Sequence, residues 1–263
     1  MEKSPGTQNP RATLILLHGM GDHSRALPYR LITDYLLSHN FAVYHFDLPG
    51  HGENLSDRPP VRTWQELTDR CRMSIDKAIE AGKNQPVFLI GLSLGGLIAL
   101  NYASKFPVKL KGLIAASPAL DTGGAPRLLQ LILKMIAGIA PGLRIDVKLD
   151  LKNISRDTKA VAEYTADPFW QSKTTVGFAA SVLYGIKETQ KLVGRLKTPV
   201  LVLQGTSDTI VPNAGGVKYF GQTGSTDKEI RQYPGVYHNL FLEPERELIF
   251  ADIQNWISGR LTE

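Results

Sequence analysis

Three residues with the chemistry of a nucleophile, an acid and a base stand in the order Ser93, Asp208, His238, each beyond the end of a strand-like run. A serine hydroxyl is a weak nucleophile at neutral pH, so a histidine must accept its proton during the attack. An aspartate beside that histidine holds the imidazole in one tautomer and stabilises its charged form. We therefore predict that Ser93, Asp208 and His238 form a catalytic triad that works through an acyl-serine intermediate.

Ser93 lies in the pattern Gly91-x-Ser93-x-Gly95, between an apolar run and a segment rich in Leu and Ala. A strand that turns into a helix at one residue strains that residue and requires small neighbours two positions away. The strain exposes the serine oxygen beside the helix N-terminus, whose free N–H groups favour a developing anion. A glycine-rich turn with an inert serine is the alternative, and the additional Gly96 favours the nucleophile elbow.

The two partners of the serine each have a simpler interpretation. Asp208 could serve only as a turn residue, and His238 could be an ordinary histidine of a surface loop. Asp121, just past an earlier strand-like run, is a rival for the acid. Asp208 is favoured because it lies between the last two predicted strands, where this chain order expects the acid.

A second glycine-rich loop, His18 to His23, directly follows the first long apolar run. Glycines after a buried strand let the backbone turn tightly and expose its N–H groups. We assign the oxyanion hole to the N–H groups of Met20 and Leu94, each worth about 3 kcal/mol. Asp22 and His23 either form a polar rim or contact the polar head group of a substrate.

Strand-like and helical segments alternate through most of the chain. Helical spacing is found at 29–39, 64–81, 213–223 and 245–258, and apolar or alternating strand-like runs at 13–17, 41–46, 87–90, 113–116, 199–204 and 229–233. Such alternation predicts an α/β fold with a mostly parallel sheet of about six strands and helices on both faces. Residues at the carboxyl ends of its strands would then meet at one edge.

The alternation stops between residues 119 and 197, which divides the predicted core into 1–118 and 198–263. Within this helical insertion, residues 128–136 are apolar almost all round, so they must pack on the main domain or face lipid. We expect this stretch, with Phe169 and Trp170, to line a site for an acyl chain.

Composition limits the other possibilities. The chain has 263 residues and a single cysteine, Cys71, so it forms no internal disulfide. The net charge of +5 lies wholly in residues 119–197. The basic residues there either belong to an ordinary solvated surface or attract this segment to an anionic membrane in transient contacts. The six histidines show no metal-ligand spacing, no basic-aromatic pattern indicates nucleic acid, and no signal-peptide core is present. We expect a cytoplasmic protein without a metal.

Several motifs together resemble the monoacylglycerol lipase and lysophospholipase branch of the α/β-hydrolase superfamily. They are His18-Gly19-Met20-Gly21-Asp22-His23, Asp47-Leu48-Pro49-Gly50-His51-Gly52, Gly91-Leu92-Ser93-Leu94-Gly95-Gly96, Gln204-Gly205-Thr206-Ser207-Asp208 and Tyr237-His238. The resemblance implies a helical cap over 119–197 and a cofactor-free hydrolase that cleaves single-chain lipid esters. Three departures matter. The family usually has two further strands before the first loop, it often has Ser where Asn54 stands and Glu where Asp22 stands, and the cap diverges most from the family.

Other functions remain open at this point. A general carboxylesterase or a lysophospholipase would use the same triad. An aminopeptidase, an acyltransferase or a non-catalytic ligand-binding homologue is a more distant alternative. The aminopeptidase would need carboxylates for the substrate amine, and no clear cluster of them is present in residues 119–197. The oligomeric state is not indicated.

Overall fold

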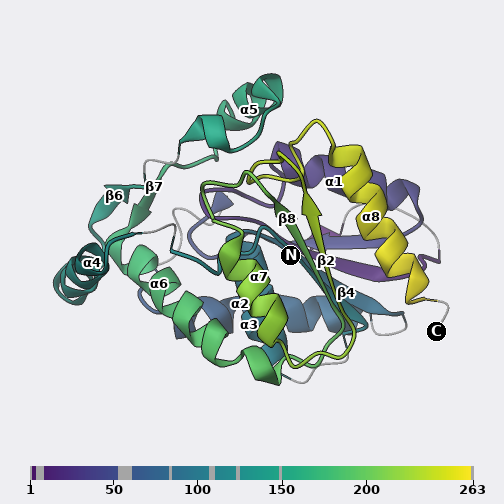
Figure 1. The fold of residues 1–263 in the computed structure, drawn as a ribbon, viewed down its shortest axis with the longest axis horizontal. Coiled ribbons are helices and arrows are strands. Elements are labelled where there is room, and N and C mark those ends of the chain that lie inside the picture. The colour runs from purple at the N-terminus through teal and green to yellow at the C-terminus, as the bar shows by residue number, and fades with distance from the viewer. Residues whose placement is uncertain are drawn as a thin grey trace.

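One large sheet runs through the protein. The computed structural model describes residues 2–3, 9–52, 61–82, 85–106, 110–122, 125–147 and 150–261 (Figure 1). The strands of the sheet are β1 (Glu2–Lys3), β2 (Thr13–Leu17), β3 (Ala42–His45), β4 (Val87–Leu92), β5 (Gly112–Ala116), β8 (Val200–Gly205) and β9 (Lys228–Tyr233). Their order is β1-β3-β2-β4-β5-β8-β9, and β1 alone is antiparallel. The prediction of about six mostly parallel strands is confirmed, with the two-residue β1 added at the edge.

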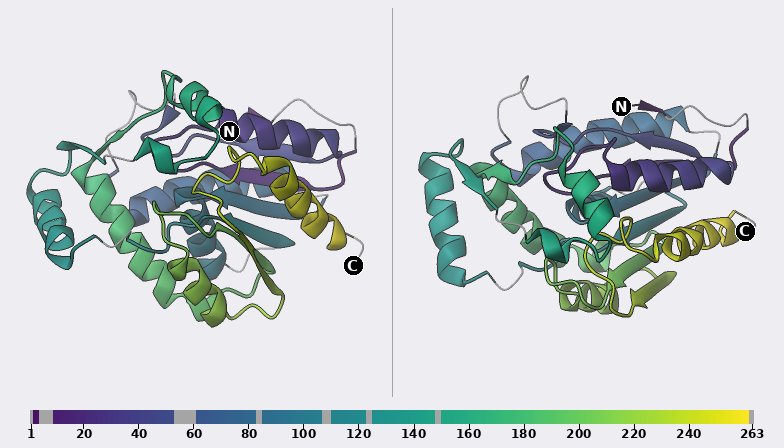
Figure 2. Two further views of the ribbon diagram at one scale, coloured as in Figure 1. Left: turned by 45° about the horizontal axis from the view of Figure 1, so that its top comes forward. Right: turned by 90° about the horizontal axis from the view of Figure 1, so that it is seen from above.

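Helices cover both faces of this sheet (Figures 1 and 2). They are α1 (Leu27–Ser38), α2 (Trp64–Ala81), α3 (Leu94–Lys105), α7 (Ala214–Gln222) and α8 (Arg246–Gly259). Buried side chains of α2, α3 and α7 form one core with the sheet, and those of α1 and α8 form the other. Because both faces are covered, β2, β4, β5 and β8 are buried along their whole length, which explains their continuous apolar runs.

The start of α2 shows how closely local sequence signals can mark an element. The hydroxyl of Thr63 accepts the backbone N–H of Glu66 at 3.1 Å. The carboxylate of Glu66 in turn accepts the N–H of Arg62 at 3.0 Å. This reciprocal cap satisfies donors that a helix N-terminus leaves free, and the helix begins at Trp64 as predicted.

The segment between β5 and β8, here called the insert (residues 119–197), interrupts the alternation of strands and helices. It contains α4 (Arg127–Ile139), β6 (Arg144–Asp146), α5 (Thr158–Thr165), β7 (Lys173–Thr175) and α6 (Val176–Lys191). Helix α6 packs on α2 and α3 of the main body, and α4 packs on α6. The antiparallel pair of β6 and β7 was not predicted, because three-residue strands carry no periodic signal.

Helix α4 keeps most of its apolar surface exposed. None of its residues is buried, and Leu128, Met135 and Ile139 are 67%, 63% and 87% exposed. Of the two alternatives that the sequence left open, packing on the main domain is not observed, because α4 makes its main contact with α6. No helix in the described part of the chain combines the length and the apolar character needed to cross a bilayer.

Candidate active site

The chain turns sharply at Ser93, between β4 and α3. The backbone of Ser93 has φ 55° and ψ −115°, a conformation that L-residues rarely adopt. A Cβ atom on Gly91 would lie 2.6 Å from the nitrogen of Gly96. A Cβ atom on Gly95 would lie 2.7 Å from the backbone oxygen of His18, and closer still to that of Leu17. The glycines are therefore required by close backbone packing, and the strained turn presents Ser93 at the carboxyl edge of the sheet.

Ser93, His238 and Asp208 form one continuous hydrogen-bonded chain. The Oγ atom of Ser93 is 3.0 Å from Nε2 of His238, and Nδ1 of His238 is 2.7 Å from Oδ2 of Asp208. Oδ1 of Asp208 accepts the N–H groups of Ile210 and Val211, both at 2.9 Å. The loops after β4, β8 and β9 bring the three residues together as predicted. With Nδ1–H donated to Asp208, Nε2 of His238 is free to take the serine proton.

The loop after β2 lies against Ser93 and is braced by His18. Nδ1 of His18 donates to the carbonyl of Gly19 at 2.8 Å, and its Nε2 accepts the N–H of Leu48 at 2.8 Å. Burial, assisted by the nearby His51, lowers the pKa of His18 to about 3, so this imidazole stays neutral. His18 thus fixes the loop that carries Met20 and takes no proton in the reaction.

A cavity of about 750 Å³ opens from Ser93 and His238 towards the insert. Met20 and Leu94, the predicted oxyanion donors, both line it beside the serine. The walls that the insert contributes are mostly apolar, and they include Leu129, Leu133, Ala179, Val182, Leu183 and Ile186. The volume falls within the range of ligand pockets and the lining matches an elongated apolar group.

The polar end of the cavity is built around Asp22, which is 2% exposed. Its carboxyl group accepts the N–H of His23 at 3.0 Å and hydrogen bonds from the hydroxyls of Tyr29 and Tyr164. Burial raises the pKa of Asp22 to about 7 despite these bonds. Sequence reasoning found Asp22 but missed both tyrosines, because they come from α1 and α5.

The raised pKa of Asp22 predicts a pH-dependent stability. Because the pKa in the folded chain lies above the ordinary 3.8, the stability from this group is fully present below pH 4 and is lost as pH rises to about 7. Between pH 5 and pH 8 the wild type is expected to lose about 2 kcal/mol of unfolding free energy that Asp22→Asn retains. Urea unfolding at both pH values measures this difference. Asp34→Asn, which changes an exposed carboxylate of α1, should behave as wild type, and equal pH dependence of wild type and Asp22→Asn would refute the assignment.

Two predicted substrate contacts lie elsewhere. His23 and Phe169 are not among the residues that line the cavity; their rings pack against each other with centroids 5.6 Å apart. Nε2 of His23 is 3.1 Å from Oδ2 of Asp167, so this pair joins the loop to the insert. In this structure their contacts join the loop after β2 to the insert, and their role in substrate contact stays a prediction. Trp170 does line the cavity, as predicted.

Sequence reasoning also missed Glu243, a fully buried carboxylate that ties the insert to the loop of His238. Glu243 accepts the backbone N–H groups of Arg156 at 3.1 Å and of Tyr237 at 3.2 Å. It also pairs with the guanidinium Nε of Arg156 at 2.7 Å. The N–H of Asn239 donates to the carbonyl of Ile154. The insert is therefore hydrogen-bonded to the chain on both sides of His238, through Tyr237 and Asn239.

Replacing Glu243 by Gln is expected to lower the unfolding free energy by about 3 kcal/mol. The amide oxygen can still accept the two backbone N–H groups, but the amide NH₂ then faces the Nε–H of Arg156, which loses its acceptor and the charge opposite it. Chemical denaturation of the purified variant measures the change. The matched control is Glu245→Gln, since Glu245 pairs with the same Arg156 at the exposed side and should cost less than about 1 kcal/mol. Equal effects of the two substitutions would contradict the role of Glu243.

No group of three or more metal-ligating side chains occurs among the residues whose positions are described. The imidazole of His238 stands between a hydroxyl and a carboxylate, where Ser93 and His238 line a largely apolar cavity. This arrangement fits the attack of a serine on an acyl group.

Comparisons with known proteins agree with this geometry. The chain matches the family model Hydrolase_4, described as serine aminopeptidase, S33, over residues 8–245. A monoacylglycerol lipase of Mycolicibacterium smegmatis is 29% identical, and the match covers 96% of this chain and 90% of that protein. Phospholipase YtpA of Bacillus subtilis is 31% identical over 92% and 93% of the two chains. The crystal structure of Paleococcus ferrophilus monoacylglycerol lipase has a TM-score of 0.88, 32% identity and 98% coverage of each chain.

The family match extends over the insert as well as over most of the main body. The structural match includes nearly every residue of both proteins, so the insert has a counterpart there. The chain therefore belongs to the Hydrolase_4 family of serine aminopeptidase S33 type and is a serine hydrolase with the α/β-hydrolase fold.

Proposed function

We propose that this protein is a carboxylic-ester hydrolase of the monoacylglycerol lipase type, which cleaves single-chain lipid esters through an acyl-Ser93 intermediate. The observation that carries the proposal is the hydrogen-bonded chain of Ser93, His238 and Asp208 at the base of a cavity whose insert side is apolar. Curated relatives named monoacylglycerol lipase and phospholipase support a lipid ester as the substrate class.

In the proposed reaction, Oγ of Ser93 attacks the ester carbonyl carbon while Nε2 of His238 takes the hydroxyl proton. The N–H groups of Met20 and Leu94 stabilise the oxyanion of the tetrahedral intermediate. His238 then gives its proton to the departing alcohol, which leaves the acyl group on Ser93. Water, deprotonated by His238, attacks the acyl carbon, and the fatty acid leaves as Ser93 regains its proton.

The two ends of the cavity differ in polarity and indicate where each end of the substrate would bind. The acyl chain would follow the apolar wall from Ser93 past Val182 and Leu133, as the insert then acts as a cap over the site. The head group would face Asp22, which the tyrosine hydroxyls hold in place. Asn239 lines the same cavity, and its Oδ1 is buried without a partner among the described residues.

The exposed apolar side of α4 supports one further part of the proposal, a transient contact of the cap with a lipid surface. Leu128, Leu131 and Met135 are 67%, 55% and 63% exposed on this helix, next to the cavity wall. A single-chain lipid ester is delivered from such a surface. Insertion of these side chains into the acyl region of a membrane would remove their apolar surface from water, which is favourable.

A phospholipase or a peptidase is the main competing assignment. The relative from Bacillus subtilis favours the first, and the family description favours the second. An aminopeptidase needs a charged carboxylate for the substrate ammonium. Burial raises the pKa of Asp22 to about 7 and so weakens its charge at neutral pH, whereas Asp121, Asp146 and Asp150 also line the cavity, on the side of the insert.

A panel of three substrates tests the proposal: a 1-monoacylglycerol, a lysophosphatidylcholine with the same acyl chain, and an aminoacyl p-nitroanilide. We expect kcat/KM to be highest for the monoacylglycerol and to rise with acyl length up to the capacity of the cavity. A preference for the lysophospholipid would shift the assignment to a lysophospholipase. Turnover of the anilide alone would overturn the ester hydrolase.

A further inference from the structure

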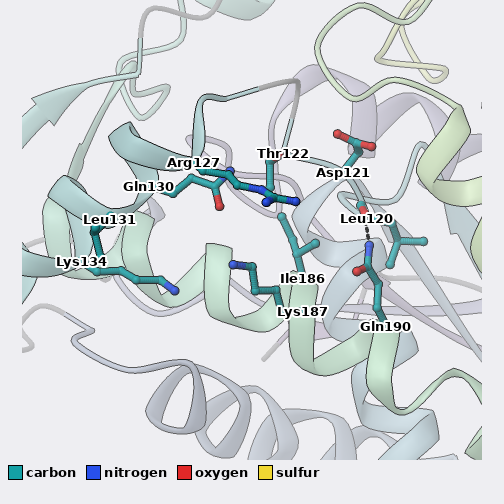
Figure 3. Close-up of a pocket in the computed structure, with 10 residues that line it drawn as sticks. All are labelled: Leu120, Asp121, Thr122, Arg127, Gln130, Leu131, Lys134, Ile186, Lys187 and Gln190. Carbon is teal, nitrogen blue, oxygen red and sulfur yellow. Dashed lines mark hydrogen bonds between the residues drawn. The ribbon is translucent and has the colours of Figure 1, made fainter.

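A second, basic pocket lies between α4 and α6 of the insert, and Ser93 is not among the residues that line it (Figure 3). Its volume is about 510 Å³. Arg127 and Lys134 extend from α4 and Lys187 from α6, and Figure 3 shows the two ammonium groups pointing towards each other across it. None of these three residues has a role in the proposed ester hydrolysis.

The charges around this basic pocket are unbalanced. Of the described residues that line it, Asp121 alone carries a carboxylate. Figure 3 shows that carboxylate directed away from Lys134 and Lys187. Three cations that converge on one hollow repel one another, and an anion placed among them would relieve that repulsion. The arrangement therefore favours a negatively charged ligand.

The basic pocket borders the active-site cavity. Four residues line both: Asp121, Thr122, Gln130 and Ile186. The amide of Gln190 donates to the carbonyl of Leu120 at 2.8 Å, and the side chains of Leu120 and Ile186 there are buried. A ligand whose head lies among the cations would reach the apolar chamber past Ile186, which lines both cavities.

We propose that the basic pocket binds the anionic head of a single-chain amphiphile, a carboxylate or a phosphate monoester, whose tail occupies the active-site cavity. The proposal rests on the proposed function in one respect: a fatty acid anion is then the product of the enzyme. In this binding mode the charged head of the ligand is remote from Ser93, whereas the ester group of a substrate lies beside Ser93. Its tail fills the space of the substrate acyl chain, so it inhibits competitively.

Binding of dodecanoate, dodecyl phosphate, dodecanol and inorganic phosphate, each measured by calorimetry below its micellar concentration, tests the proposal. We expect the wild type to bind at least one of the two charged amphiphiles ten times more tightly than dodecanol, and the tighter of the two identifies the head group. The double variant Lys134→Gln/Lys187→Gln should lose at least tenfold in affinity for that ligand and none for dodecanol. The same ligand should inhibit hydrolysis of p-nitrophenyl acetate competitively, and more weakly in the double variant.

The matched control is Lys191→Gln/Lys218→Gln, which removes two charges from the neighbouring hollow that Lys187 also borders. This control should bind the charged amphiphiles as the wild type does. Equal losses in both double variants would overturn the basic pocket in favour of diffuse surface charge. Equal affinity for dodecanol and both charged amphiphiles would overturn the anion site, and inorganic phosphate binding as tightly as dodecyl phosphate would overturn the role of the tail. Calorimetry needs no turnover, so failure of lipid ester hydrolysis leaves this test intact.

Discussion

The Asp208→Asn variant will keep its fold and lose about 10⁴-fold in kcat. Two backbone N–H groups, those of Ile210 and Val211, point at Oδ1 of Asp208 and require an oxygen there. The amide NH₂ of the variant must then face Nδ1 of His238. A donor in that place forces the proton onto Nε2, the atom that must accept the proton of Ser93.

Steady-state hydrolysis of a soluble p-nitrophenyl ester measures this loss, and the thermal midpoint checks the fold. Asp121→Asn is the control, because Asp121 lines the cavity but Asp208 holds Nδ1 of His238. It should retain more than a tenth of the wild-type kcat. The triad is contradicted if Asp208→Asn is nearly as active as wild type or if Asp121→Asn is the inactive variant.

Gly95→Ala is expected to destabilise the fold by more than about 4 kcal/mol, or to prevent folding altogether. The new Cβ would lie 2.7 Å from the backbone oxygen of His18, and closer to that of Leu17. These atoms belong to β2 and to the loop beside Ser93, so they cannot withdraw without breaking the sheet or the oxyanion loop.

Gly138→Ala provides the contrast for this experiment. Gly138 also lies in a helix, α4, but a Cβ atom there meets nothing within 4 Å. The substitution should raise the unfolding free energy by up to about 1 kcal/mol, because alanine favours the helix over the unfolded chain. Urea unfolding of both variants gives the comparison. A Gly95→Ala protein as stable as wild type would mean that the elbow is not packed as described.

Features that a continuous segment encodes were predictable. Buried parallel strands appear as apolar runs because helices cover both faces, and α2 was predicted from helical spacing over 64–81. The chain order of Ser93, Asp208 and His238 placed each beyond a strand, so the parallel sheet brought them to one edge. The closeness of the three side chains needed no information beyond that topology.

Features that depend on contacts between distant segments were not predictable. The hydroxyls of Tyr29 and Tyr164 meet Asp22 from two different helices, and no spacing rule joins them. Glu243 looks like one more surface charge in the sequence, yet the turn after His238 buries it against Arg156. His23 and Phe169 were expected in the cavity, but the way the insert folds back on the first loop places them outside it.

The exposure of α4 shows a third limit. An almost wholly apolar stretch usually predicts burial, because exposed apolar surface is unfavourable in water. Here the helix stands at the outer end of the insert and touches α6 with one side only (Figure 1). The pattern alone identifies the surface as apolar, and only the position of the helix shows that it faces outward.

Hydrolysis of a long-chain 1-monoacylglycerol by the wild type and by Ser93→Ala, side by side, tests the central claim most directly. The account predicts release of glycerol and fatty acid in equal amounts by the wild type, and a rate at least about 10⁴-fold lower for Ser93→Ala at unchanged thermal stability. Ser93→Ala that still cleaves the ester at a substantial fraction of the wild-type rate would contradict the account. A wild type that does not cleave it at all would do the same.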